Sequence, residues 1–261
     1  MSRSGVPTAG TMYDRTCLAV GYSSRRRADP RVAAQIAAAL GPASRVLNVG
    51  AGAGSYEPRR PGCAVVAVEP SIAMLAQRPL GAASAVRAVA EHLPFADGSF
   101  AAALASLTVH HWSDPAAGLA ELRRVAPRQV VLTWDPDVVA RSFWFTRDYL
   151  PGALARERER GLWTVDEIAA ALAPVQVEPV PVPWDCTDGF FGAYWRRPRA
   201  YLLPVVRNAI SALALLDPGV VDDAVRRLSA DLDTGRWQQR YAHLSRLDSL
   251  DLGYRLVVGG A

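Results

Sequence analysis

The sequence predicts an α/β fold in which a mostly parallel sheet lies between helices. Short apolar runs alternate with helical patterns, and two of the runs lead into residues typical of a nucleoside-binding site. The run at 45–49 leads into alternating glycines over Gly50–Gly54, and the run at 64–69 ends in Glu69. Glycines allow a sharp turn where a Cβ would collide. A carboxylate that closes the next strand can accept hydrogen bonds from both hydroxyls of a ribose.

The first half of the chain alternates regularly between strands and helices. Asp29 followed by Pro30 predicts a helix start, because a carboxylate caps free N–H groups and proline suits the first helical position. Asp114 and Pro115 repeat this pattern. Apolar runs bounded by turn residues predict the strands. The expected order is helix 29–40, strand 45–49, strand 64–69, helix 70–75, strand 85–89, strand 100–107, helix 116–125 and strand 129–134.

After Asp135 the alternation gives way to helices. Residues 141–161 predict an arginine-rich helix, and Thr164 with Glu167 has the spacing of a capping box for a helix over 164–172. Alternating valines over 175–184 predict an edge strand, since prolines interrupt the run. Residues 185–250 predict several helices separated by proline and glycine, and residues 254–258 predict a last strand.

Composition argues against several classes of protein. The 261 residues carry a formal net charge of +4, and every cation is arginine, scattered along the chain apart from short clusters such as 25–27. A nucleic-acid binder usually shows a continuous basic stripe with aromatic residues between the charges. The three cysteines lack metal-site spacing, and no signal peptide or membrane span is evident. We expect a cytoplasmic protein without a nucleic-acid or membrane partner.

The glycine segment has three interpretations. A dinucleotide-binding fingerprint requires a further glycine where this chain has Ser55, which disfavours a nicotinamide cofactor. A phosphate-binding P-loop requires a lysine, and the chain contains none. A purely structural turn would leave Glu69 without an explanation. A different nucleoside is therefore expected.

Four segments, of which the glycine segment is the first, occur in a fixed order. They are Val46–Gly54; Val66–Ser71 with Met74 and Leu75; Ala90–Phe100; and Leu107–Pro115 leading into 118–125. Together they resemble the class I S-adenosylmethionine-dependent methyltransferases, in particular the small-molecule branch (methyltransferase type 11) that includes enzymes of ubiquinone and menaquinone biosynthesis. The resemblance covers about residues 13–135. It implies a Rossmann-like, seven-stranded, mostly parallel sheet flanked by helices, with an added helical lid.

The resemblance also implies a domain division and cofactor contacts. Residues 1–28 would form an N-terminal cofactor lid, 29–184 the cofactor-binding core, 185–250 a helical substrate lid inserted before the last strand, and 251–261 the final strand. Tyr22 would cover the methyl site, although a surface helix ending near Arg27 explains that segment equally well. The residues expected to bind S-adenosylmethionine are Tyr22, Asn48, Gly50, Ala51, Gly52, Gly54, Glu69, Pro70, Met74, Ala90, Glu91 and Thr108.

Acceptor and catalytic residues are expected beyond the fourth strand. His110 is the candidate general base, because a histidine at the carboxyl edge of the sheet can remove a proton from a hydroxyl. Aromatic side chains over the sheet edge fit a lid on an apolar acceptor, and helix packing is the competing interpretation. No metal site is expected. The residues predicted to bind the acceptor are His111, Trp134, Phe143, Trp184, Phe190 and Trp195.

The predicted function is methyl transfer to a small molecule, most readily at oxygen and in secondary metabolism, by a monomer or homodimer. In-line displacement at a sulfonium is accelerated mainly by approximation and alignment. For this reason the family shares cofactor motifs but no common catalytic residue. Two alternatives remain open: the same fold and cofactor catalysing a cyclisation or rearrangement, and a cofactor-binding subunit without chemistry.

Overall fold

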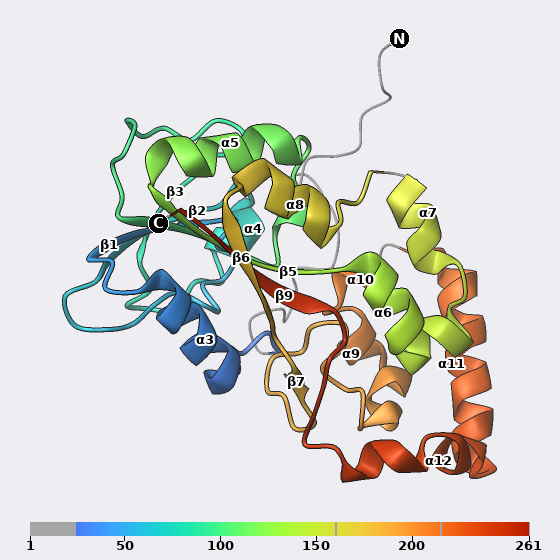
Figure 1. The fold of residues 1–261 in the computed structure, drawn as a ribbon. Helices are drawn as coiled ribbons and strands as arrows, with labels where there is room; N and C mark the ends of the chain where they lie inside the picture. The colour runs from blue at the N-terminus through green and yellow to red at the C-terminus, as the bar shows by residue number, and fades with distance from the viewer. Residues whose placement is uncertain (1–24, 160, 215, 261) are drawn as a thin grey trace.

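The computed structural model describes residues 25–159, 161–214 and 216–260. Its central sheet has seven strands in the order β3-β2-β1-β4-β5-β9-β6, and β9 runs antiparallel to both of its neighbours (Figure 1). The other pairings, between β1 through β5, are parallel. The predicted fold class is therefore confirmed. The strands of this sheet are β1 (Arg45–Val49), β2 (Ala64–Val68), β3 (Ser84–Val86), β4 (Ala102–Ser106), β5 (Arg128–Trp134), β6 (Val175–Pro179) and β9 (Tyr254–Gly259).

Helices cover both faces of the sheet, and neighbouring residues of β1 point to opposite sides. Val46 packs in one apolar core with Ile36 of helix α3 (Pro30–Leu40). Leu47 packs in the other with Leu119 of α5 (Pro115–Val125) and Ile168 of α8 (Val165–Leu172). Both faces of a parallel sheet must be covered in this way, because its strands are apolar on both sides. Figure 1 shows α5 and α8 above the sheet and α3 below it.

Several predicted helix boundaries are confirmed by their capping contacts. The Asp29 carboxylate accepts from the backbone N of Arg31 at 3.0 Å, at the start of α3. Thr164 and Glu167 form the expected capping box of α8. Ser71 caps the short helix α4 (Ile72–Leu75), with its hydroxyl accepting from the backbone N of Met74. These ends were predictable because capping depends on local sequence.

Three predicted elements differ from the structure. The helix expected over 141–161 is divided into α6 (Pro136–Ser142), a π-helical turn (Phe145–Tyr149) and α7 (Ala153–Glu159). The strand expected over 175–184 is split, because β6 joins the main sheet whereas β7 (Val182–Pro183) pairs with β8 (Ser249–Leu250). Arg25 is helical but Arg26 forms an isolated antiparallel bridge with Asp188, so the helix expected near Arg27 ends at Arg25. In each case tertiary contacts override the local pattern.

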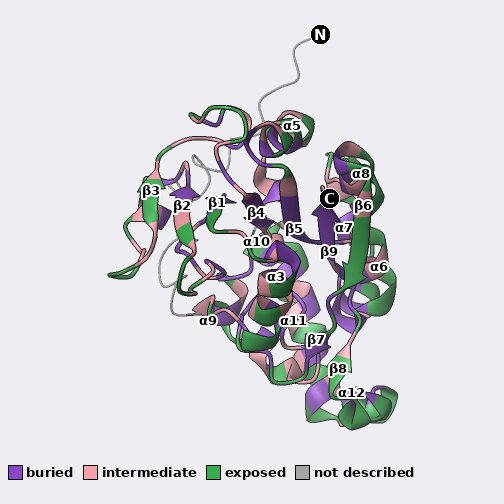
Figure 2. Cartoon of the chain, turned by 60° about the vertical axis from the view of Figure 1, so that its left-hand side comes forward, coloured by how far each residue is buried: buried purple, intermediate pink, exposed green. Residues whose placement is uncertain are grey.

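The inserted helices share one apolar core. Figure 1 shows α6, α7, α11 and α12 gathered beyond the β5–β9 side of the sheet. The aromatic rings of Trp144, Tyr201 and Trp237 meet there, with Trp144 5.8 Å from Tyr201 and 5.3 Å from Trp237 between ring centroids. Burial follows the same layers, with the central strands buried and β6 exposed at the edge (Figure 2). The remaining elements of this region are α9 (Pro204–Arg207), α10 (Ser211–Ala214), α11 (Pro218–Asp233), α12 (Arg236–Arg240) and 3-10 turns at Pro198–Leu202 and Ala242–Arg246.

Candidate active site

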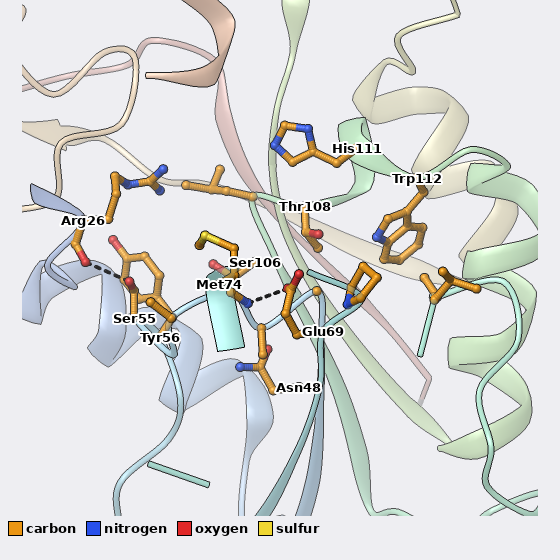
Figure 3. A pocket seen from close by; sticks show the side chains of 18 of the residues that line it. Arg26, Asn48, Ser55, Tyr56, Glu69, Met74, Ser106, Thr108, His111 and Trp112 are labelled. Carbon is orange, nitrogen blue, oxygen red and sulfur yellow. Dashed lines mark hydrogen bonds between the residues drawn. The ribbon is translucent and has the colours of Figure 1, made fainter. Parts of the chain in front are cut away.

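A pocket of about 920 Å³, open to solvent, lies where β1, β2 and β4 end. Ligands of open α/β sheets bind at this carboxyl edge, where the strand order changes direction. Figure 3 shows Glu69 at its centre, with Thr108 above it and Asn48 below. Ten of the residues predicted to bind the cofactor line this pocket: Asn48, Gly50, Ala51, Gly52, Glu69, Pro70, Met74, Ala90, Glu91 and Thr108.

Glu69 is held rigidly at the end of β2. One carboxylate oxygen accepts from the backbone N of Gly52 at 2.8 Å, and the other accepts from the backbone N of Ser71 at 2.9 Å. The residue is buried, yet it lines the pocket. These two bonds connect the glycine loop to the start of α4 and fix the direction of the carboxylate. A fixed, buried carboxylate suits a ligand that offers paired hydroxyl donors.

Position 50 must be glycine for two reasons, the conformation of the turn and the close approach of Thr108. Its φ is +66°, and an added Cβ would lie 2.0 Å from the Thr108 Oγ1. The loop after β1 therefore packs directly on the residue that follows β4. This contact explains the first glycine without reference to any ligand.

We expect Gly50→Ala to destabilise the fold, because it combines a left-handed backbone with a steric overlap. Overpacking of this kind costs about 1–3 kcal/mol, and the positive φ adds about 1 kcal/mol. Urea unfolding of Gly50→Ala, Thr108→Gly and the double variant measures the two effects separately. The double variant should recover the overpacking part only; a double variant as unstable as the sum of the two single variants would contradict the assigned overlap.

Gly54 does not line this pocket, unlike the other two glycines of the segment. Its backbone turns at φ +89° beside a buried ion pair, in which Arg78 Nη2 lies 2.5 Å from Glu57 Oε1. Arg78 Nη1 also donates to the carbonyl oxygen of Gly52 at 3.3 Å. The Glu57–Arg78 ion pair therefore supports the glycine loop from outside the pocket. Sequence analysis missed it, because Glu57 and Arg78 are far apart along the chain.

The wall opposite the glycine loop is anchored by Glu91. Its Oε1 accepts from the backbone N of Ser113 at 2.7 Å and from the backbone N of Asp114 at 3.1 Å. The segment after β3 is thereby attached to the start of α5. Glu91 lines the pocket as predicted, and its contacts also give it a structural role. Tyr22 lies outside the described residues.

A second pocket, of about 390 Å³, adjoins the first. Arg26, Leu107 and His111 line both pockets. Leu107 has a φ of +52°, the one positive value at a non-glycine residue among those described. Such a conformation costs about 1–3 kcal/mol, and strain of this kind clusters at functional sites. The tip of β4 therefore forms the junction between the two pockets.

Only some of the residues predicted to bind the acceptor line the second pocket. His111, Trp134 and Phe190 line it, together with His110. Phe143 and Trp195 are fully buried in the helical core and line none of the described pockets. Trp184 is exposed, with the Arg196 guanidinium 4.9 Å from its ring centroid. The packing interpretation of the aromatic residues therefore describes Phe143 and Trp195 better than the lid interpretation.

The two histidines are half-buried and line the second pocket. Their ring centroids lie 4.0 Å apart, and His110 packs edge-on against Trp134 at 5.9 Å. Burial lowers the pKa of His110 well below its usual range, and His111 and Arg26 lower it further. Burial and Arg26 lower the pKa of His111 to about 4. Both imidazoles are therefore neutral near pH 7. The Nδ1 of His110 is buried and has no hydrogen-bond partner within the part of the chain that the structure describes.

These depressed pKa values predict that stability falls in mild acid. Between about pH 6.5 and pH 4, His111 is protonated in the unfolded chain and neutral in the folded protein. Protons are then taken up on unfolding, so the free energy of unfolding decreases as the pH is lowered. The slope is at most about 1.4 kcal/mol per pH unit for each histidine. Urea unfolding at several pH values should show a smaller slope for His111→Gln. The exposed His92, as His92→Gln, is the matched control, and equal slopes in the two variants would contradict the assignment.

Arg26 and Asp188 form a buried ion pair beside the junction, with Nε 2.6 Å from Oδ1. The carboxylate of Asp188 is fully buried, and the side chain of Arg26 is 11% exposed. The backbone carbonyl of Arg26 accepts from the Ser55 hydroxyl at 2.8 Å. Figure 3 shows Arg26 on one side of the pocket and His111 on the other. The arginine cluster at 25–27 was the only signal for this site in the sequence, and no pattern indicated Asp188 as its partner.

Neither a metal-binding cluster nor a membrane-spanning helix occurs among the described residues. No group of three or more histidine, cysteine, aspartate or glutamate side chains could hold a metal ion within the described ranges. No helix in the same ranges is long and apolar enough to cross a membrane.

The sheet order and the carboxylate-bearing pocket define the class I methyltransferase architecture. A family model described as "Methyltransferase domain" matches residues 47–132. A solved structure from Anabaena variabilis, described as a methyltransferase from an antibiotic biosynthesis pathway, is 31% identical with a TM-score of 0.82. That match covers 91% of this chain and 99% of the other. The chain therefore belongs to the methyltransferase-domain family of S-adenosylmethionine-dependent enzymes, and S-adenosylmethionine is its cofactor.

More distant structures share the fold alone. The [4+2]-cyclase SpnF is 18% identical with a TM-score of 0.55, and the match covers 100% of both chains. A phosphoethanolamine N-methyltransferase 2 from Haemonchus contortus, solved with S-adenosylhomocysteine, is 16% identical with a TM-score of 0.55. That match covers 97% of this chain and 59% of the other. The comparison with curated protein sequences finds no match.

Proposed function

We propose that the protein transfers a methyl group from S-adenosylmethionine to an oxygen of a small apolar acceptor. The observation that carries this proposal is the pair of adjoining pockets that share Leu107, His111 and Arg26. The larger pocket has the carboxylate expected for a nucleoside cofactor. The smaller one is mainly aromatic and apolar, which suits a compact acceptor.

In the proposed cofactor site, Glu69 binds both ribose hydroxyls and thereby sets the orientation of the cofactor. Its position is maintained by the backbone N–H groups of Gly52 and Ser71. Thr108 and Gly50, in contact with one another, form the floor near the reacting atoms. The wall at Ala90 and Glu91 accommodates the base. Gly54, which was predicted to bind the cofactor, is instead given a structural role, because it faces the Glu57–Arg78 pair.

When bound, the cofactor supplies a methyl group on a sulfonium, which an acceptor takes by in-line displacement to leave a thioether. The protein orients the acceptor, excludes water and manages the acceptor proton. His110 is the proposed base, since it lines the acceptor pocket and its buried Nδ1 has no hydrogen-bond partner among the described residues. The aromatic walls at Trp134 and Phe190 exclude water from the acceptor.

Other features of the proposal follow the sequence analysis. The residues 29–184 and 251–261 are assigned to the cofactor-binding core and 185–250 to the acceptor side, with α6, the π-helical turn and α7 now added to it. This addition is supported by the packing of α11 against the π-helical turn. We further propose a cytoplasmic monomer or homodimer that acts in secondary metabolism, in agreement with the pathway named for the Anabaena relative.

Methyl-labelled cofactor tests the reaction directly. The protein is incubated with it and with a panel of phenols and enols, and label should appear in an ether product with equimolar S-adenosylhomocysteine. Glu69→Ala should abolish this product. Conversion of an acceptor without label transfer or loss of the cofactor would overturn methyl transfer and favour a cyclisation or rearrangement.

A further inference from the structure

The strongest unassigned feature is the charge at the junction of the pockets. Among the described residues that line the acceptor pocket, Arg26 is the one with a formal charge at neutral pH, because both histidines are neutral. The other lining residues are aromatic, aliphatic or hydroxyl-bearing: Leu107, Trp134, Phe190, Phe191, Ile210, Ser211, Ala212 and Tyr254. An apolar pocket with one cation favours a ligand that is flat, apolar and locally negative.

The guanidinium of Arg26 is positioned by the same loop that forms the aromatic wall. Asp188 holds its Nε at 2.6 Å, and Phe190 and Phe191 follow two and three residues later. The backbone N of Gly189 donates to the carbonyl oxygen of Arg25 at 3.0 Å, which ties the two segments together. Asp188 is fully buried and does not line the acceptor pocket. The charge that faces this pocket is therefore the positive charge of Arg26.

The field of Arg26 extends across this pocket. It lowers the pKa of His110 and of His111, which lie on the opposite wall. Burial raises the pKa of Tyr254, and Arg26 opposes this increase more strongly than Asp188 adds to it. At Tyr254, which lines the acceptor pocket, the positive charge of the ion pair therefore outweighs the negative one. Inside a low-dielectric pocket such a charge stabilises an oxyanion.

The properties of His110 lead to the same class of acceptor. His110 lines the same pocket as Arg26, and burial lowers its pKa, so it is a weaker base than a free imidazole and removes a proton most readily from an acidic hydroxyl. An aliphatic alcohol is too weak an acid for such a base. A phenol or an enol next to a cation meets this requirement.

We propose that the acceptor is a planar aromatic or enolic hydroxyl compound that ionises in the second pocket, with Arg26 stabilising its oxyanion and His110 taking its proton. This inference rests on the proposed methyl transfer and names its acceptor class. The hydroxyl O–H bond breaks, its proton passes to Nδ1 of His110 and then to solvent, and the oxygen electron pair forms the new O–CH₃ bond while the S–CH₃ bond breaks. The step requires no reactant other than the acceptor and the cofactor.

The test uses 4-nitrophenol, whose visible absorbance reports its ionisation, bound to the protein with S-adenosylhomocysteine present. The pKa of the bound probe should lie at least about one unit below that of the free probe, as expected for an opposite charge close by. Arg26→Lys should retain most of this decrease. Arg26→Met combined with Asp188→Asn, which avoids an unpaired buried charge, should abolish it. Arg27→Met, at an exposed residue outside the acceptor pocket, is the matched control and should retain it.

Calorimetric binding of S-adenosylhomocysteine to each variant shows whether it is folded and separates two roles for Arg26. The contrary result is a double variant that loses affinity for S-adenosylhomocysteine while the bound probe keeps the same pKa as in the unmodified protein. In that case Arg26 binds the cofactor carboxylate, and the proposal is overturned. An unshifted probe pKa in the unmodified protein, or failure of the probe to bind, also overturns it.

The experiments distinguish a failure of the proposed methyl transfer from a failure of this inference. A protein that transfers label to acceptors but does not lower the pKa of the probe retains the proposed function without an Arg26-stabilised oxyanion. A protein that ionises the probe through Arg26 but transfers no label retains the binding site and loses the proposed function.

Discussion

Replacing Glu69 by glutamine should weaken binding of S-adenosylmethionine and S-adenosylhomocysteine by a factor of about 10 to 100. The carboxylate faces the pocket and is already aligned by Gly52 and Ser71, and a hydrogen bond to a charged group contributes about 1.5–3 kcal/mol. Glutamine keeps the shape and one acceptor oxygen, so one of the two backbone contacts is kept and the other is lost. The two ligands share the ribose and should therefore lose affinity equally.

Isothermal titration calorimetry measures both affinities, and urea unfolding measures the stability of each variant. Glu178→Gln on the exposed edge strand β6 removes the same charge away from the pocket and is the matched control. Unchanged affinity in Glu69→Gln would show that this carboxylate does not bind the ribose. A loss of stability as large as the loss of binding free energy would assign Glu69 a structural role.

Removing Asp188 should destabilise the protein by about 3–5 kcal/mol. The carboxylate is fully buried against Arg26, and loss of one partner leaves an uncompensated charge in a low-dielectric site. Arg26→Met with Asp188→Leu should recover most of this loss, since a buried ion pair contributes little net stability relative to apolar side chains of similar volume.

An exposed ion pair in the same region provides the control. Arg31 and Asp185 lie 2.8 Å apart with side chains 50% and 48% exposed, so Asp185→Ala should cost no more than about 1 kcal/mol. Chemical unfolding of the four proteins measures the differences. Equal costs for Asp188→Ala and Asp185→Ala would contradict the assigned burial of the Arg26–Asp188 pair.

Much of the cofactor side was predictable, because its signals are local in the chain. A strand followed by alternating glycines, and a second strand ending in Glu69, place their residues at one edge of a parallel sheet wherever the crossovers lie. The helix starts at Asp29, Ser71 and Thr164 were equally predictable from capping chemistry.

The acceptor side was less predictable, because aromatic residues indicate burial without indicating which cavity they line. Trp134 and Phe190 line the second pocket, whereas Phe143 and Trp195 fill the helical core. These pairs do not differ in residue type or in hydrophobic pattern. Their positions depend on how the helices after β5 pack, which involves contacts between residues far apart in the chain.

The sequence by itself determined the fold class and the carboxylate at the end of β2, since each depends on residues within a strand, a turn or a helix end, and its resemblance to a known family implied the cofactor. Tertiary structure alone decided which charge faces the acceptor, why Gly50 must lack a Cβ and which braces hold the glycine loop. Arg26 meets Asp188, Gly50 meets Thr108 and Glu57 meets Arg78 only after the chain has folded. Such partners depend on three-dimensional proximity, which no local pattern of residues encodes.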